Sequence, residues 1–299
     1  MDLRRHYCFF AIHCIINRER GEEMLMKENQ SFFMDRIKRE PFFKMSTAHV
    51  HPYYEIYYLL SGKRKMFINH TLYTVDKGDI LIIDKGELHR TTFIGDGPHE
   101  RIVINFTDCF LEPLFKNIGK EGSLSALTTA HLAIPIGRKK YVEELLDKIT
   151  YEGELHDRFS EMLQRNHFYE LLVFLMRCQA FQKKEDVVKD VVDVKMQEAA
   201  KYICEHYEDA LTLEEIAERV HMSPTYFSKK FKKVTGFGFK EYIGQVRIKE
   251  ASHLLLETKA SITDIALACG FSDSNYFGDV FKKLKGISPY KYRQNKGAL

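Results

Sequence analysis

The sequence predicts an α+β protein of two domains: a small N-terminal β-barrel with a helical segment, and an all-α C-terminal domain with two helix-turn-helix units. Three observations support this prediction. At 299 residues the chain is too long for one ordinary compact domain. Short apolar runs separated by turn residues fill its first part, whereas apolar residues at helical spacing fill the rest. Within the helical part, one pattern occurs twice, about 50 residues apart.

The composition excludes several classes of protein. A hydrophobic content of 44% and a charged content of 29% are typical of folded globular chains. No run of about twenty apolar residues occurs, so we expect no membrane partner. The six cysteines lack the spacing of zinc sites or disulfide frameworks, which indicates reduced thiols in the cytoplasm. The net charge is only +3, but residues 195–299 hold 17 Lys and Arg against 13 Asp and Glu. The basic excess therefore lies in the C-terminal third.

The start of the chain resembles a signal peptide, but charged residues interrupt its apolar patch and no small-residue cleavage site follows, so we expect no export. Because Met24 and Met26 lie just before the strand pattern begins, we interpret residues 1–26 as an N-terminal extension, with a frayed helix as the alternative. The strand pattern of the predicted barrel lies within residues 27–137. Turn residues at Ser61-Gly62, Asn69-His70 and Lys77-Gly78 separate its short apolar runs, as in a barrel of hairpins. The predicted strands are Glu55–Leu60, Lys63–Ile68, Leu72–Val75, Asp79–Ile83 and Arg101–Phe106.

Residues 138–181 have helical periodicity and predict a pair of helices. We predict that this segment forms a homodimer through the apolar face of its second helix, at Phe168, Leu171, Leu172 and Leu175. The alternative is that these residues only cover the barrel. The charged stretch 182–194 is the predicted linker. The apolar positions of the two helices are Val142, Leu145, Leu146 and Ile149, then Phe168, Leu171, Leu172 and Leu175.

The repeated pattern lies in residues 195–299. Each copy contains Ile-Ala and, later, Tyr-Phe-x3-Phe-Lys-Lys-x2-Gly, and the second copy has one extra residue in its turn. Ser223 and Asp273 are good N-cap residues, and Pro224 suits a first helical position. The copies are predicted as helices Leu213–Val220 and Pro224–Val234, then Ile262–Cys269 and Ser274–Lys285.

A connecting helix is predicted over Phe239–Glu257, which at 1.5 Å per residue is about 28 Å long. One turn of B-DNA is about 34 Å long, so a rigid helix of this length could place the second helices of both units in successive major grooves. A purely helical interaction domain is the alternative, but it does not explain two turn-capped helix pairs with short polar and basic residues at the groove-facing positions.

The stretch Leu211–Arg293 resembles the DNA-binding domain of the AraC family of transcription regulators. Especially specific are Arg247-Ile248, Ile265-Ala266-x3-Gly270-Phe271 and Gly286-x-Ser288-Pro289. The resemblance implies a sequence-specific regulator that binds double-stranded promoter DNA. RNA polymerase would be a further partner if the protein activates transcription.

The resemblance also implies which side chains face DNA. Asn275 could pair with adenine and Lys229 with guanine, whereas the lysine pairs near each helix end suit phosphates. Asp279 departs from the expected pattern, because a carboxylate there would face a polyanion. The implied positions are Pro224, Thr225, Ser228, Lys229, Lys232 and Lys233, then Ser274, Asn275, Gly278, Asp279, Lys282 and Lys283.

A second resemblance, to the two cupin motifs, covers His49-x-His51-x3-Glu55-x6-Gly62 and Gly78-x7-Gly86-x2-His89. The histidines and carboxylate could ligate a divalent metal, which makes a metal-dependent cupin enzyme the rival interpretation. AraC-type sensor domains usually keep this pattern for folding or effector contact, so we expect no enzyme, no metal and no cofactor. The implied effector-binding residues, for a small molecule such as a sugar or sugar derivative, are His49, His51, Glu55, Tyr57, His89 and Arg101.

Overall fold

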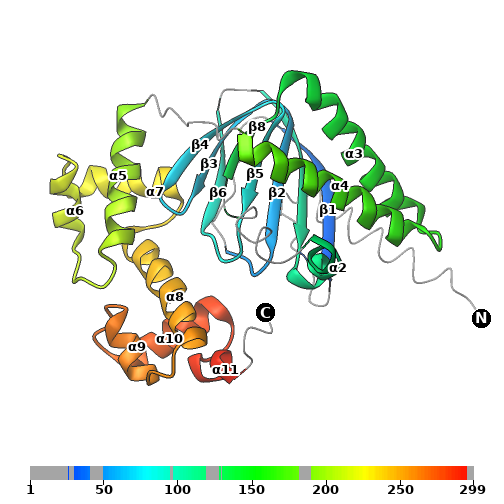
Figure 1. Cartoon of the computed structure of the whole chain (residues 1–299). Coiled ribbons are helices and arrows are strands. Elements are labelled where there is room, and N and C mark those ends of the chain that lie inside the picture. Colours follow the sequence, from blue (N-terminus) through cyan, green and yellow to red (C-terminus); the bar gives the residue numbers. More distant parts are fainter. Residues whose placement is uncertain are drawn as a thin grey trace, which may run out of the picture.

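A computed structural model describes residues 26, 30–40, 50–94, 97–118, 128, 130–181 and 190–294. Except for Met26, the predicted extension 1–26 lies outside the described residues. The chain has an N-terminal region of strands and helices and an all-helical C-terminal region (Figure 1). This division agrees with the predicted two-part architecture. Among the described residues, no helix combines the length and the apolar character needed to cross a membrane.

Eight antiparallel strands form two sheets in the described part of the N-terminal region. One sheet has the strand order β1-β7-β2-β5-β8 and the other has the order β4-β3-β6. No closed barrel is shown for the described strands, although every predicted strand is present. The bounds are β1 Phe32–Arg39, β2 Tyr54–Ser61, β3 Lys63–Ile68, β4 Thr71–Asp76, β5 Asp79–Ile83, β6 His89–Phe93, β7 His99–Phe106 and β8 Ala130–Ala133.

The turns between the strands have the conformations that their residues favour. Gly62 and Gly78 have φ values of 88° and 82°, a region that side chains with a Cβ rarely adopt. Between the two sheets lies a buried apolar cluster drawn from both of them. Its members are Tyr57, Leu59, Met66, Ile68, Val75, Leu81, Ile83 and Val103.

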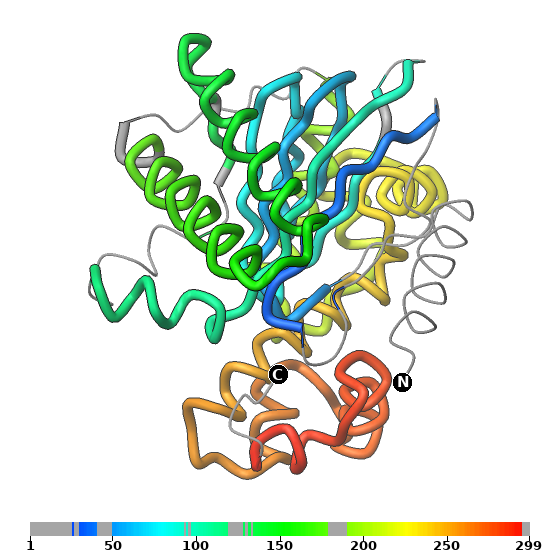
Figure 2. Tube along the Cα trace, turned by 90° about the vertical axis from the view of Figure 1, so that its right-hand side faces the viewer, coloured from blue at the N-terminus to red at the C-terminus, as the bar shows by residue number. Residues whose placement is uncertain are grey.

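Three helices cover the outer face of the five-stranded sheet: α2 (Asp108–Ile118), α3 (Ile136–Leu155) and α4 (Ser160–Phe181) (Figure 2). The α4 residues that we assigned to a dimer interface are fully buried against this sheet, so that part of the prediction is wrong. A side chain that packs inside its own domain offers no surface to a second copy. The residues concerned are Phe168, Leu171, Leu172 and Leu175.

The C-terminal region begins with α5 (Val191–Glu205), which starts inside the stretch predicted as linker; residues 182–189 of that stretch lie outside the described residues. The predicted connecting helix is confirmed as α8 (Phe239–Glu257, 19 residues). The other helices are α6 Leu213–Arg219, α7 Pro224–Thr235, α9 Ile262–Ala268, α10 Ser274–Lys285 and α11 Pro289–Gln294.

Two apolar cores hold the C-terminal region together, a first core around the first helix-turn-helix unit and a second core around the second unit. The second core is built from α8 to α11, with Tyr207 packed against it. The first core combines α5 to α8 with Phe67, Leu72 and Leu88 of the N-terminal region. The three-stranded sheet and its loops therefore share a core with the first helix-turn-helix unit.

Candidate DNA-binding surface and buried polar cluster

The first helix-turn-helix unit is fixed by caps at both of its helices. Thr212 and Glu215 form a reciprocal capping box at the start of α6. Ser223 accepts a hydrogen bond from the backbone N–H of Tyr226, and Pro224 occupies the first helical position of α7, as predicted. His221 adopts a φ of 55° in the turn between the helices.

The second unit uses different residues for the same geometry. Ser261 caps α9. Asp273 accepts hydrogen bonds from the backbone N–H groups of Asn275 and Tyr276, both at 3.1 Å, which confirms it as the N-cap of α10. Gly270 makes the bend with a φ of 78°, and a Cβ there would lie 2.6 Å from the carbonyl oxygen of Glu208. Glycine is thus required at this bend.

The phenylalanine pairs of the repeat pack inward, which leaves the opposite faces of α7 and α10 open. Phe227 and Phe231 lie in the first core with Ile216, and Phe277 and Phe281 lie in the second core. None of the twelve predicted DNA-facing residues is buried. Those exposed are Pro224, Thr225, Lys229, Lys232, Lys233, Asn275, Asp279, Lys282 and Lys283, and those half-buried are Ser228, Ser274 and Gly278.

Sequence reasoning missed one pair of residues on these faces. Tyr226 and Tyr276 occupy equivalent positions in α7 and α10 and are 50% and 61% exposed. Both tyrosines belong to the repeated Tyr-Phe pattern, so their spacing from the buried phenylalanines could have identified them. An exposed phenol beside a polar helix face can donate to a phosphate oxygen.

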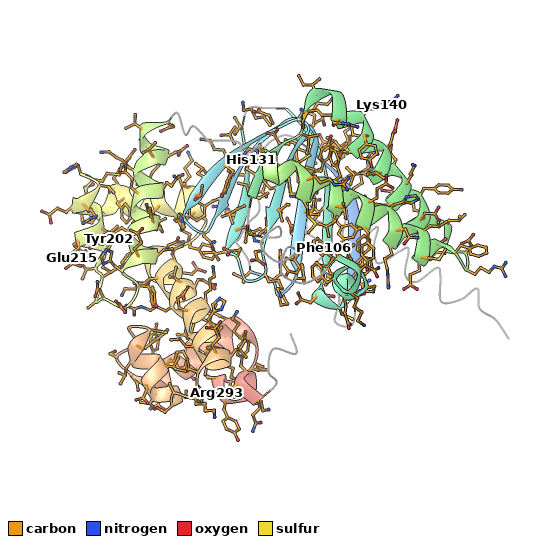
Figure 3. All side chains as sticks on the ribbon, in the orientation of Figure 1. Phe106, His131, Lys140, Tyr202, Glu215 and Arg293 are labelled. Atoms are coloured by element: carbon orange, nitrogen blue, oxygen red, sulfur yellow. The ribbon has the colours of Figure 1, made fainter. Side chains whose placement is uncertain are left out.

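Two arginines of the repeat region donate hydrogen bonds to backbone carbonyl groups and do not point outward. Arg247 donates from Nε to the carbonyl oxygen of Tyr207 at 2.7 Å and from Nη2 to that of Asp209 at 2.8 Å. Arg293, which is labelled in Figure 3, donates from Nη2 to the carbonyl oxygen of Ala260 at 2.7 Å. These residues of the AraC-like pattern therefore tie α8 and α11 to neighbouring loops.

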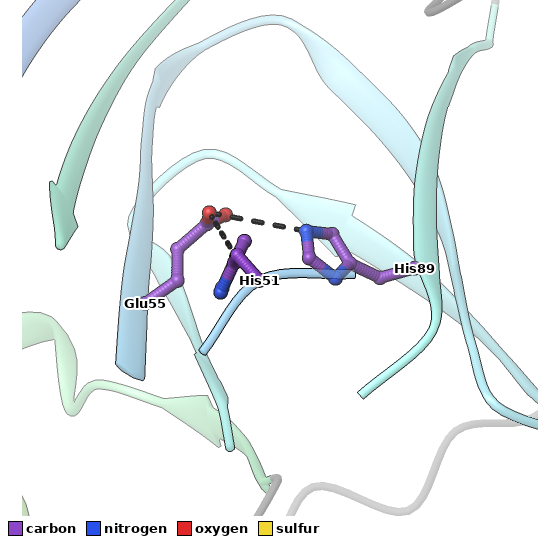
Figure 4. Close-up of side chains that lie close together, drawn as sticks. All are labelled: His51, Glu55 and His89. Atoms are coloured by element: carbon purple, nitrogen blue, oxygen red, sulfur yellow. Dashed lines mark hydrogen bonds and ion pairs between the residues drawn. The ribbon is translucent and has the colours of Figure 1, made fainter. Parts of the chain in front are cut away.

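A buried polar cluster lies at one end of the space between the sheets (Figure 4). His51 Nε2 lies 3.2 Å from Glu55 Oε2, and His89 Nε2 lies 3.9 Å from the same oxygen. The two imidazole rings meet edge to face, with centroids 4.8 Å apart. The structure thus brings together three of the predicted site residues, whereas His49 lies outside the described residues.

The other two predicted effector residues lie further along the interior. Tyr57 and Arg101 are buried, with the Arg101 guanidinium carbon 5.4 Å from the centre of the Tyr57 ring. The pKa of the His99 imidazole is lowered to about 3. Burial is the largest cause, and the nearby positive charges of Arg64, Arg101 and Arg39 add to it. This end of the interior is therefore rich in positive charge.

The His51–Glu55–His89 cluster has the ligand types and the spacing of a metal site. One ligand atom from each residue lies within 4.8 Å of the other two, and all three residues are buried. Two imidazoles and one carboxylate form a donor set that suits divalent first-row transition metals. The residues present therefore fit a metal ion.

Comparison with known families gives two matches along the chain. A helix-turn-helix domain model matches residues 216–295, which include most of α6 and all of α7 to α11. A model described as the ExsA N-terminal regulatory domain matches residues 54–184, which include most of the strands together with α3 and α4.

Relatives that match more than four fifths of the chain are also transcription regulators. The Msm operon regulatory protein of Streptococcus mutans is 31% identical over 244 residues, which cover 81% of this chain and 84% of that protein. The HTH-type transcriptional regulator YisR of Bacillus subtilis is 26% identical over 270 residues, or 85% of this chain and 91% of that protein. Among solved structures, ToxT of Vibrio cholerae is 17% identical and covers 90% of this chain and 99% of its own, with a TM-score of 0.37.

Proposed function

Because this chain belongs to the AraC family of DNA-binding transcription regulators, which are not enzymes, we propose that a small-molecule effector bound by its N-terminal region controls its binding to promoter DNA. One observation carries the proposal: two capped helices, α7 and α10, each present an open polar face and are joined by the 19-residue helix α8. At about 28 Å, α8 approaches the pitch of B-DNA. One chain can then contact two successive major grooves.

We assign base recognition to the exposed faces of the two helices. Lys229 and Asn275 are the residues whose side chains can donate to base edges, each worth about 1 to 3 kcal/mol of discrimination. Lys232, Lys233, Lys282 and Lys283 suit phosphate contacts, which add affinity without reading sequence. Tyr226 and Tyr276 join this second group because they are exposed beside the lysines.

We assign effector binding to the interior between the two sheets, which we regard as a cupin-like barrel within residues 27–137. His51, Glu55 and His89 offer polar groups at one end, and Tyr57 and Arg101 offer an aromatic face and a guanidinium further in. Guanidinium groups bind carboxylates and phosphates well. The positive charge around His99 therefore favours a sugar derivative with an acidic group over a neutral sugar.

We propose that the protein works in the cytoplasm as a homodimer, with the segment 138–181 as the contact and 195–299 as the DNA-binding domain. With the α4 apolar face buried, the exposed apolar side chains near the α3–α4 turn are the better support for this contact. They are Tyr151, Leu155, Phe159 and Met162, between 47% and 61% exposed. Replacing Phe159 by Asp should lower the sedimentation coefficient if this surface joins two copies.

A genome-wide footprint of the full chain tests the proposal. We expect a small set of protected promoters whose protection changes when an acidic sugar derivative is supplied, but not when the matching neutral sugar is supplied. Affinity for a recovered operator should fall steeply with salt, as phosphate contacts require. RNA polymerase recruitment would follow at promoters that the protein activates. A chain that protects no promoter under any supplement would contradict the proposal.

A further inference from the structure

The three-stranded sheet presents a row of three side chains to the C-terminal region. Phe67 of β3 pairs with Leu72 of β4 on one side and with Arg90 of β6 on the other. Residues that lie directly opposite one another on neighbouring strands share a face of the sheet. Phe67 and Leu72 are buried in the first core, together with residues of α5 to α8. The outer face of this sheet is therefore one wall of the first helix-turn-helix unit.

Arg90 extends this row to the C-terminal end of α7. It is buried, and its Nη1 donates to the carbonyl oxygens of Lys232 and Lys233 at 3.3 and 3.4 Å. The last carbonyl groups of a helix carry partial negative charge, so a guanidinium is stabilising there. Gly236, which ends α7, leaves room for this contact, because a Cβ at that position would clash with Arg90 Cδ. The N-terminal region thus supplies the cation at the end of α7.

Contacts from the same strands and from the turn between them also hold the helices on either side of α7. Each contact joins a polar group of residues 65–72 to a side chain of α5 or α8. The contacts are an ion pair of Lys65 with Asp193 of α5, a hydrogen bond from the Leu72 N–H to Gln197 Oε1 of α5 at 3.0 Å, and one from the Tyr242 hydroxyl of α8 to the carbonyl oxygen of Asn69 at 2.5 Å. Three helices of the first unit are therefore attached to one sheet.

The sheet is packed on its inner face as well. Met66 and Ile68, which alternate with Phe67 along β3, lie in the buried cluster between the two sheets. A side chain is held most precisely when it stands on a packed strand or helix. The core of the second unit, in contrast, is built from residues 207–292. This packing gives Arg90 a rigid support for its contact with α7.

We propose that the three-stranded sheet holds α7 in the orientation that base recognition requires, and that Arg90 is the positioning residue. The proposal rests on the proposed function for the assignment of base recognition to α7 and α10. Arg90 acts through the backbone of Lys232 and Lys233, which it holds by their carbonyl oxygens. Its removal should loosen the last turns of α7 and leave α10 as it is.

Amide hydrogen exchange of the full chain without DNA tests the hold on α7. Arg90→Ala should speed exchange in residues 229–235 about fivefold or more, whereas the equivalent residues 279–285 of α10 should exchange as in the parent chain. Arg90→Lys keeps a cation at the same helix end and should restore most of the protection. Arg36→Ala is the matched control and should exchange like the parent, because the partners of Arg36, Glu100 and Asp147, belong to the N-terminal region.

Operator binding by the same variants tests positioning apart from stability. The base pairs at which Lys229→Ala loses discrimination identify the groove that α7 enters. At those base pairs, Arg90→Ala should discriminate against single substitutions about fivefold less than the parent, and at the base pairs read by α10 it should discriminate equally well. A general loss of folded protein would instead lower the affinity for all operator variants alike. Arg90→Lys should recover the discrimination.

Each contrary result overturns a stated part of the proposal. If Arg90→Ala exchanges like Arg36→Ala, or if exchange rises equally in α7 and α10, the sheet does not hold α7. If Arg90→Ala discriminates like the parent in both grooves, Arg90 stabilises the first unit without positioning it. If the parent chain binds no operator, the proposed function fails, and the exchange comparison still decides whether the sheet holds α7.

Discussion

The two helix-turn-helix units have nearly the same sequence pattern but different surroundings. Each has a capped second helix, a buried phenylalanine pair and a left-handed glycine at its end, with φ values of 93° at Gly236 and 76° at Gly286. The first unit shares its core with strands and loops of the N-terminal region, whereas the core of the second unit comes from residues 207–292. The repeated pattern thus determines the local fold, and the place in the chain determines which unit the N-terminal region can influence.

The units also differ in charge at an equivalent position of the polar face. Lys229 of α7 corresponds to Asp279 of α10, and both side chains are exposed. A lysine attracts the DNA backbone or a guanine edge, whereas a carboxylate is repelled unless it accepts from a cytosine amino group. We therefore propose that the first unit is the main reader of bases; it is also the unit that shares its core with the N-terminal region.

The two units should differ most in thermal unfolding, when the equivalent core residues Phe231 and Phe281 are each replaced by Ala. Both are fully buried, and each change to Ala should cost about 3 to 5 kcal/mol. Phe231 packs against Tyr242, which reaches the N-terminal region, so Phe231→Ala should lower the melting temperature of the whole chain in one transition. Phe281→Ala should instead give a separate early transition of the second unit in calorimetry.

Limited proteolysis supplies the control for this comparison. In Phe281→Ala, early cleavage should fall after α8 and leave the N-terminal region with the first unit intact. Equal calorimetric profiles for the two variants would show that the shared core does not couple the first unit to the sheet.

The next largest effect concerns base recognition. Lys229→Ala should weaken operator binding by about 1 to 3 kcal/mol and relax specificity at one base pair. Asn275→Ala should cost less, because Asp279 weakens the approach of α10 to DNA. Gel shifts against operator variants measure both changes. Lys232→Ala is the control: a phosphate contact should weaken binding to all sequences alike and reduce the salt slope by about 1.

Much of the C-terminal region could be predicted from sequence because its signals are local. The caps Ser223 and Asp273 and the bounds of α8 are confirmed. The N-terminal region could be predicted less well. Its strands are marked by turn residues, but the burial of the α4 apolar face depends on a sheet distant in sequence. The attachment of Arg90 to α7 joins residues more than 140 positions apart, and no local pattern encodes it.

A smaller difference should separate Gly236→Ala from Gly286→Ala. Both substitutions place a Cβ in the left-handed region, at a cost of about 1 to 2 kcal/mol. At position 236 the Cβ would also lie 2.4 Å from Arg90 Cδ, whereas at position 286 it would meet no atom within 4 Å. Gly236→Ala should therefore destabilise the full chain by roughly 1 kcal/mol more, as measured by urea unfolding.

Arg90 provides the test of this explanation. In a double-mutant cycle, Arg90→Ala should remove the excess cost of Gly236→Ala and leave the cost of Gly286→Ala unchanged. If Gly236→Ala still destabilises the chain more than Gly286→Ala when Arg90 is absent, the clash with the N-terminal region is not the cause of the difference.

The smallest expected effect tests the charge difference between the two polar faces. Replacing Asp279 by Asn removes a repulsion that amounts to about 1 kcal/mol or less between charges near 4 Å in water. Operator affinity should therefore rise up to about fivefold at low salt, and the gain should fade as salt screens the phosphates. Glu112→Gln, which removes an exposed carboxylate on α2, is the matched control and should leave the affinity unchanged. Weaker binding by Asp279→Asn would instead show that this carboxylate accepts a hydrogen bond from a cytosine, and the second unit would then read bases as directly as the first.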